Sequence, residues 1–249
     1  MMSRKKTMGI LLAIILLTCF IVGIFFWTIS PKSYYPKEQV KIYLYGETHG
    51  KKHAYDKEFE IWKKYYDEQG LRDLFIEQPY FTGQFLNLWM KAEDDTILEQ
   101  VYADLDGTLG HVPEHLNFYK QIKEQCPETV FHGTDVGHQY FSTGERYLDY
   151  ALKAYGENSE EYRRAKDNIA QAVKYYENDD NAYRENAMVQ NFVREYDALG
   201  KDAVIVGIYG SKHCDPRKKD DSGKVDCMAK QLLAQYGDVI QYENVMKMK

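Results

Sequence analysis

The chain has 249 residues and a formal net charge of −6 at pH 7. Acidic and basic residues are interspersed along it, so the composition argues against a protein that binds nucleic acid through the phosphate backbone. Residues 40–249 are enough to bury the core of one α/β domain without disulfide bonds.

Residues 1–30 are predicted to form an N-terminal membrane anchor. A basic run at residues 4–6 precedes residues 8–29, which contain no charged side chain and are rich in Leu, Ile and Phe. At about 1.5 Å per residue, a helix of this length crosses a hydrocarbon core of about 30 Å. The positive-inside rule then places the N-terminus in the cytoplasm and the domain outside the cell membrane. A signal peptide, whose cleavage would give a secreted domain, has a shorter apolar run and a small-residue cleavage site.

Residues 31–39 contain two prolines and are predicted to be a tether between the anchor and a domain at residues 40–249. The domain alternates short apolar runs with segments of helical periodicity. Strands are predicted at residues 40–44, 74–76, 130–132, 203–208 and 239–242.

Helices are predicted between these strands, and Gly70 is expected to end the first of them. They cover residues 54–69, 85–92, 115–124 and 225–236, and a helical zone at residues 144–199 has breaks near 156–158 and 179–180. The alternation predicts an α/β fold with a mainly parallel central sheet, helices on both faces and a long helical insertion.

The pattern Tyr-Gly-x-x-His occurs twice, each time directly after a predicted strand, at residues 45–49 and 209–213. In open α/β sheets, ligands bind outside the carboxyl ends of the strands, so His49 and His213 are expected to reach one crevice. The glycine of each copy is expected to let the backbone turn as the strand ends. The other five histidines have no paired pattern and are interpreted as surface or packing residues.

Carboxylates also follow predicted strands, at Glu47, Glu77 and Asp135. Two imidazoles with a carboxylate can bind a divalent transition metal and leave a position for water, so His49, Glu77 and His213 are predicted metal ligands. Without metal, His49 can act as a general base whose ring Glu47 or Glu77 orients. Either route predicts a hydrolase.

Two further sequence patterns indicate other possibilities. Asp104 and Asp106 resemble the aspartyl nucleophile motif of haloacid-dehalogenase-type phosphatases, but that motif closes the first strand of its domain, so a phosphatase is a remote alternative. Cys214 and Cys227 bracket a polar loop, which a disulfide worth about 3 kcal/mol can close in an outside-facing domain. Cys126 would then stay unpaired, and the sequence leaves the bridge open.

The paired Gly-x-x-His, with Glu77 after the second strand, resembles the TraB/Tiki group within the erythromycin esterase and ChaN-like superfamily. The resemblance covers residues 40–242. The family also has an arginine on a helix before the second motif, and Arg184 occupies a matching place. The resemblance implies that Arg184 holds a carboxylate or an oxyanion, for which its planar guanidinium is suited.

The superfamily implies several activities on one fold. Tiki-like members resemble manganese- or cobalt-dependent proteases, esterase-like members hydrolyse a lactone with histidine and no metal, and ChaN-like members bind haem. We therefore expect a membrane-anchored, outside-facing hydrolase that uses manganese, cobalt or zinc on a peptide or a small ester or amide. The alternative is a non-catalytic protein that binds haem or another ligand. The predicted catalytic residues are Glu47, His49, Glu77, Asp135, Arg184 and His213.

Overall fold

The computed structural model describes residues 33–248. The chain divides into two units, Met1–Lys32 and Ser33–Lys249, and only the second is described. The predicted membrane anchor and the first residues of the tether lie outside the described residues. Among residues 33–248, no helix combines the length and the apolar character needed to cross a membrane.

A mostly parallel sheet of six strands forms the centre of the described unit, in the order β1-β6-β2-β5-β3-β4. Neighbours among β6, β2, β5, β3 and β4 are parallel, and only β1, at the edge, is antiparallel to its neighbour. The strands are β1 (Ser33–Tyr34), β2 (Ile42–Glu47), β3 (Asp73–Pro79), β4 (Val130–Asp135), β5 (Ile205–Gly210) and β6 (Ile240–Asn244). This confirms the mainly parallel sheet and its five predicted strands, whereas β1 is a sixth strand within the predicted tether. The long apolar runs at β2 and β5 are those of strands covered on both faces.

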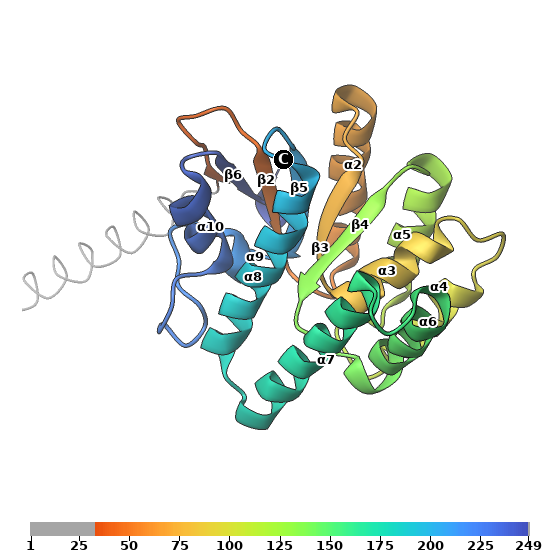
Figure 1. The fold of residues 1–249 in the computed structure, drawn as a ribbon. Helices are drawn as coiled ribbons and strands as arrows, with labels where there is room; N and C mark the ends of the chain where they lie inside the picture. The colour runs from red at the N-terminus through yellow and green to blue at the C-terminus, as the bar shows by residue number, and fades with distance from the viewer. Residues whose placement is uncertain (1–32, 249) are drawn as a thin grey trace, which may run out of the picture. The chain divides into compact units, whose positions relative to one another are not determined.

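Helices pack on both faces of the sheet through two separate apolar clusters. On one face, Trp62 of α2 (Lys52–Gln69) and Phe118 of α5 (Pro113–Gln125) share a cluster with Ile76 of β3. On the other face, Phe192 of α8 (Asn181–Leu199) shares a cluster with Ile42 of β2. Figure 1 shows α8 in front of the strands. The remaining elements are α3 (Tyr80–Trp89), α4 (Thr96–Ala103), η1 (Tyr140–Gly144), α6 (Glu145–Tyr155), α7 (Glu160–Asn178), α9 (Ser211–Cys214), α10 (Met228–Tyr236) and η2 (Val245–Lys247).

The predicted helix boundaries are mostly confirmed. Gly70 ends α2 with φ 68°, and the predicted helical zone divides into α6, α7 and α8 at the two expected breaks. Asp179 closes α7 in the left-handed region at φ 48°, and the Asp180 side chain caps α8. The largest boundary error is at the start of α3, which begins at Tyr80 and not at residue 85, because the chain enters this helix directly from β3, with Pro79 at the N-cap. Helix α3 also ends at Trp89 and not at residue 92, and α10 begins at Met228 and not at residue 225.

Candidate active site

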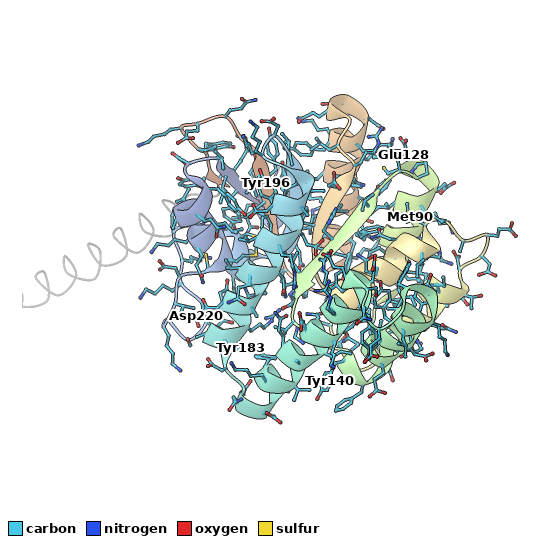
Figure 2. All side chains as sticks on the ribbon, in the orientation of Figure 1. Met90, Glu128, Tyr140, Tyr183, Tyr196 and Asp220 are labelled. Atoms are coloured by element: carbon cyan, nitrogen blue, oxygen red, sulfur yellow. The ribbon has the colours of Figure 1, made fainter. Side chains whose placement is uncertain are left out.

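The carboxyl ends of four neighbouring parallel strands bring the predicted site residues to one edge of the sheet. Glu47 ends β2 and is paired in register with Gly210 at the end of β5. Glu77 and Asp135 lie at the ends of the adjacent β3 and β4. Helix α8 begins at the same edge of the sheet. In Figure 2, Tyr183 in its first turn lies low in the view, on the side toward which the arrow of β4 points in Figure 1. Tyr196, near the other end of α8, lies high in the view.

The two motif glycines are required by close packing. A Cβ on Gly46 would lie 2.8 Å from the Cα of Ser211, and one on Gly210 would lie 3.2 Å from both His49 Nε2 and Glu77 Oε2. Neither glycine has a positive φ, so neither is required for its conformational freedom, although the chain does turn directly from β5 into α9 at Gly210. Gly46 lets β2 approach the start of α9, and Gly210 leaves room for the site itself.

His49 follows β2 and lies between two carboxylates. Its Nδ1 contacts Glu47 Oε1, and its Nε2 lies 3.6 Å from Glu77 Oε1. Hydrogen bonds to Glu47, which has the larger effect, and to Glu77 raise the pKa of His49 to about 11. The side chain is 46% exposed, so water screens part of this effect.

His213 lies in α9 and is mostly buried, with 13% of its side chain exposed. Its Nδ1 lies 2.6 Å from Glu185 Oε2, and its Nε2 lies 3.5 Å from Glu77 Oε1. Burial opposes a charge on this ring, but Glu77 and Glu185 outweigh it and raise the pKa of His213. The other oxygen of Glu185 accepts a hydrogen bond from the Met228 backbone N–H. Sequence reasoning missed Glu185; its position directly after Arg184 was the one available signal.

Glu77 is at the centre of the site, where the pairing of β3 with β4 shifts register between Ile76 and Pro79. Such irregularities are common next to functional sites, and here the Glu77 carboxylate contacts both β5 and α8. Oε2 accepts a hydrogen bond from the Gly210 N–H at 2.5 Å, and Oε1 accepts one from Arg184 at 2.7 Å. Burial opposes the charge, but His213, His49 and Arg184 hold the pKa of Glu77 well below its ordinary value.

Arg184, which the resemblance singled out, bridges two carboxylates. It donates to both oxygens of Asp135, at 3.0 and 2.6 Å, and to Glu77. Asp135 is fully buried, which opposes its charge, but Arg184 and His138 keep its pKa low. His138 Nε2 lies 3.0 Å from Asp135, so this histidine, predicted as a surface or packing residue, also lines the site. Asp135 therefore serves to hold Arg184.

A cavity of about 700 Å³ adjoins these residues. One wall is the polar edge of the sheet, and the other comes from α2, α5 and the chain after α4. The second wall is lined by Tyr55, Glu58, Leu105, Leu109, His115, Phe118 and Tyr119. Glu58 is 3% exposed and its Oε1 has no hydrogen-bond partner. Burial, and then the charge of Glu47, raise the pKa of Glu58 well above its ordinary value.

The donor set fits a divalent metal ion. One ligand atom from each of Glu47, His49 and Glu77 lies within 4.8 Å of the others. His213 is outside this group, although the sequence predicted it as a ligand in place of Glu47. Both histidines have their Nδ1 on a carboxylate, which is the usual support for an imidazole that binds metal through Nε2.

The remaining sequence patterns lie in other settings. Asp104 follows helix α4 and not a strand, and its carboxylate pairs with Arg146 and Thr143. The phosphatase motif needs a strand end at this point, so that alternative is wrong. Cys214 and Cys227 are buried and free, and no bridge joins them in the structure.

Comparison with known proteins gives the fold. No family model and no curated protein matches the chain. A Bacillus cereus protein of solved structure has a TM-score of 0.56 at 12% identity, over 83% of this chain and 65% of its own. A mutant of the erythromycin esterase EreC, in its open conformation, has a TM-score of 0.56 at 10% identity, over 82% of this chain and 69% of its own. A succinoglycan biosynthesis protein has a TM-score of 0.56 at 12% identity, over 82% and 65%.

At these identities the likeness shows the fold alone. The chain spans less than two thirds of the first of these proteins. The fold is one on which an erythromycin esterase is also built, and a shared fold does not by itself assign an activity. The TraB/Tiki branch has no support from these structures and stays a prediction.

Proposed function

We propose that the protein is a hydrolase that cleaves an ester or amide bond with a water molecule activated beside His49. The observation that supports this most directly is the convergence of two imidazoles on one carboxylate. His49 Nε2 and His213 Nε2 lie 3.6 and 3.5 Å from Glu77 Oε1, and each ring is supported by its own glutamate. Two supported rings at a cavity wall are suited to take a proton from water and return one to a leaving group.

Each side chain has a definite task in this proposal. In the route without metal, His49 acts as the base only in the fraction that has lost its Nε2 proton: Glu47 accepts the Nδ1 proton, and the neutral Nε2 takes the proton of the attacking water. Glu185 holds His213 in the same way, so that its Nε2 proton can pass to the leaving group. Arg184 is fixed by Asp135 and Glu77 and provides positive charge for the developing oxyanion.

We propose that the working form is metal-dependent, with Glu47, His49 and Glu77 as the residues that hold manganese, cobalt or zinc. When bound, such an ion would lower the pKa of a coordinated water toward about 7. The charges at the site also favour a cation. Asp135 balances Arg184. The carboxylates of Glu47, Glu77 and Glu185 then outnumber the imidazoles of His49 and His213, which their neighbours keep protonated. Metal must displace the His49 proton, so its binding should release protons and strengthen as the pH rises.

The test uses the full-length chain in detergent with a panel of peptides, carboxylic esters and amides. Turnover of one class is expected, and His49→Ala should lower kcat/KM by about 10² to 10⁴-fold. The matched control is His53→Ala, because His53 is exposed on α2. No turnover by the wild-type chain, or equal loss in both variants, would contradict the proposal.

Metal dependence is tested separately by elemental analysis and by the thermal midpoint with added manganese, cobalt or zinc. Bound metal that His49→Ala loses is the expected result. An unmoved midpoint and no bound metal would leave hydrolysis by histidine alone. A Soret band on haem addition that depends on His49 would instead favour the non-catalytic alternative.

We also propose that residues 8–29 anchor the protein in the cell membrane with the domain outside. The uncharged apolar run and the preceding basic residues support this placement. Protease added to intact cells should digest the domain if it faces outside, and protection of the domain until lysis would contradict the proposal.

A further inference from the structure

The cavity has a second wall that the proposed reaction does not use. It is formed by α2, α5 and the chain after α4, and apolar or aromatic side chains such as Tyr55, Leu105 and Phe118 line it. A wall of this kind binds an apolar part of a ligand, and its few polar groups decide which ligand fits.

Glu58 is the polar group of this wall that lacks a partner. The residue is 3% exposed, and its Oε1 makes no hydrogen bond. Among residues 33–248, three side chains have buried polar atoms without a partner, and Glu58 is the one of the three that lines the cavity. Buried polar groups almost always have partners in folded proteins, so an exception beside a cavity indicates a group that a ligand completes.

The neighbouring polar groups of the wall are already paired with one another. His115 Nδ1 lies 2.9 Å from the Gly110 carbonyl oxygen, and His115 Nε2 lies 3.1 Å from the Tyr119 hydroxyl. Both ring nitrogens are therefore used, and His115 cannot serve Glu58 without breaking an existing contact. A ligand in the cavity can supply the partner that His115 and Tyr119 do not.

We propose that Glu58 determines specificity by binding a neutral hydroxyl or amide group on the apolar part of the substrate. The proposal rests on the proposed function, since it names the substrate class of the same cavity. That class is an ester or amide whose apolar portion lies along Tyr55 and Phe118 and carries one hydrogen-bonding group. A neutral group is favoured over a cation because an ion pair in an apolar wall loses its hydration.

The experiment uses three probes that differ at one point: methyl phenylpropanoate, its para-hydroxy derivative and its para-aminomethyl derivative. The full-length chain is compared with Glu58→Gln and Glu58→Leu, and with Glu60→Gln and Glu60→Leu as matched controls. Glu60 lies on the same helix and is exposed. Both kcat/KM and the dissociation constant from calorimetry are measured for every pair.

We expect the wild-type chain to prefer the para-hydroxy probe over the unsubstituted one by about tenfold in both measurements. Glu58→Gln should keep the preference, because an amide also donates and accepts, whereas Glu58→Leu should abolish it. Both Glu60 variants should keep it. The thermal midpoint of Glu58→Leu should not fall, because the leucine replaces an unpartnered buried carboxyl.

The outcomes separate this inference from the proposed function. Binding preference that Glu58→Leu abolishes, without turnover of any probe or of the peptide, ester and amide panel, supports the inference and contradicts the hydrolase. Turnover with the same preference in Glu58→Leu and wild type supports the hydrolase and overturns the inference. Equal binding of the probes, no binding of any probe, or a Glu58-dependent preference for the aminomethyl probe would also overturn it.

Discussion

The two copies of Tyr-Gly-x-x-His have the same local sequence and different surroundings. His49 lies in the loop after β2, is 46% exposed, and is supported by Glu47 from its own motif. His213 lies in a short helix after β5, is 13% exposed, and is supported by Glu185 from α8. The first histidine is open to substrate and water, and the second belongs to the packed interior. A repeated motif thus defines a location, and the elements packed around each copy define its task.

The largest expected effect is the different response of kcat/KM and stability to substitution of Gly210 and of Gly46. Gly210→Ala places a methyl group 3.2 Å from His49 Nε2 and Glu77 Oε2, and we expect the displacement to lower kcat/KM by about 100-fold with little change in stability. Gly46→Ala meets the Ser211 backbone at 2.8 Å and should instead reduce the free energy of unfolding by about 1–3 kcal/mol. Steady-state kinetics and urea denaturation measure the two effects, and equal behaviour of both variants would break the comparison.

The two histidines should differ in their contribution to stability. His213→Ala leaves the Glu185 carboxylate, which is 2% exposed, without the ring that it contacts, so we expect a loss of about 1–3 kcal/mol in the free energy of unfolding. His49→Ala opens its position to water, which screens the lost contacts with Glu47 and Glu77, so it should cost less than His213→Ala. Urea denaturation of both variants without added metal is the measurement. A larger loss in His49→Ala would reverse the assignment of the exposed and packed copies.

His115 extends the comparison of the histidines to the pH dependence of stability. Burial lowers the pKa of His115 to about 4, whereas an unfolded histidine has a pKa of about 6.5. Between these values the unfolded chain binds the extra proton, so the contribution of His115 to stability falls by about 2 kcal/mol from pH 7 to pH 5. His115→Gln should remove this dependence in urea titrations at several pH values, and an unchanged slope would contradict it.

The contributions of His49 and His213 to stability depend on pH in the opposite direction to that of His115. Their folded pKa values are raised, so their contribution is fully present below about pH 6.5 and is lost as the pH rises through the folded values. A variant of either residue should therefore differ from wild type more at pH 6 than at high pH.

The smallest effect concerns the loop after the second copy. Cys214 and Cys227 are free, so a reducing agent should not change the thermal midpoint, and the unfolded, unreduced chain should show all four cysteines as thiols. A count near two would show that the bridge that the sequence left open forms in the mature protein.

Much of the fold was predictable because local patterns specify it. The strand positions, the end of α2 at Gly70 and both breaks in the helical zone follow from apolar runs and from residues that end helices. The start of α3 was not predictable from local patterns, because Tyr80 follows β3 without a polar loop. The site was predictable where its residues follow strands, as with His49 and Glu77.

Residues of the site on helices or in loops were missed for a physical reason. Glu58, Glu185 and His138 have no local pattern that separates them from solvent-exposed residues of the same type. Their roles come from contacts with distant parts of the chain, such as that between His213 and Glu185. A single sequence contains no direct record of such contacts.

By itself, the sequence determined the alternation of strands and helices and the two strand-end histidines, because apolar periodicity and strand termination are local properties. Tertiary structure alone decided that Glu77 is the centre, that Arg184 is held by Asp135 and that Glu58 lacks a partner. It decided them because strand order, the register shift between β3 and β4 and the packing of α8 set which distant carboxylates meet. The charge state and partner of each group in turn depend on those meetings.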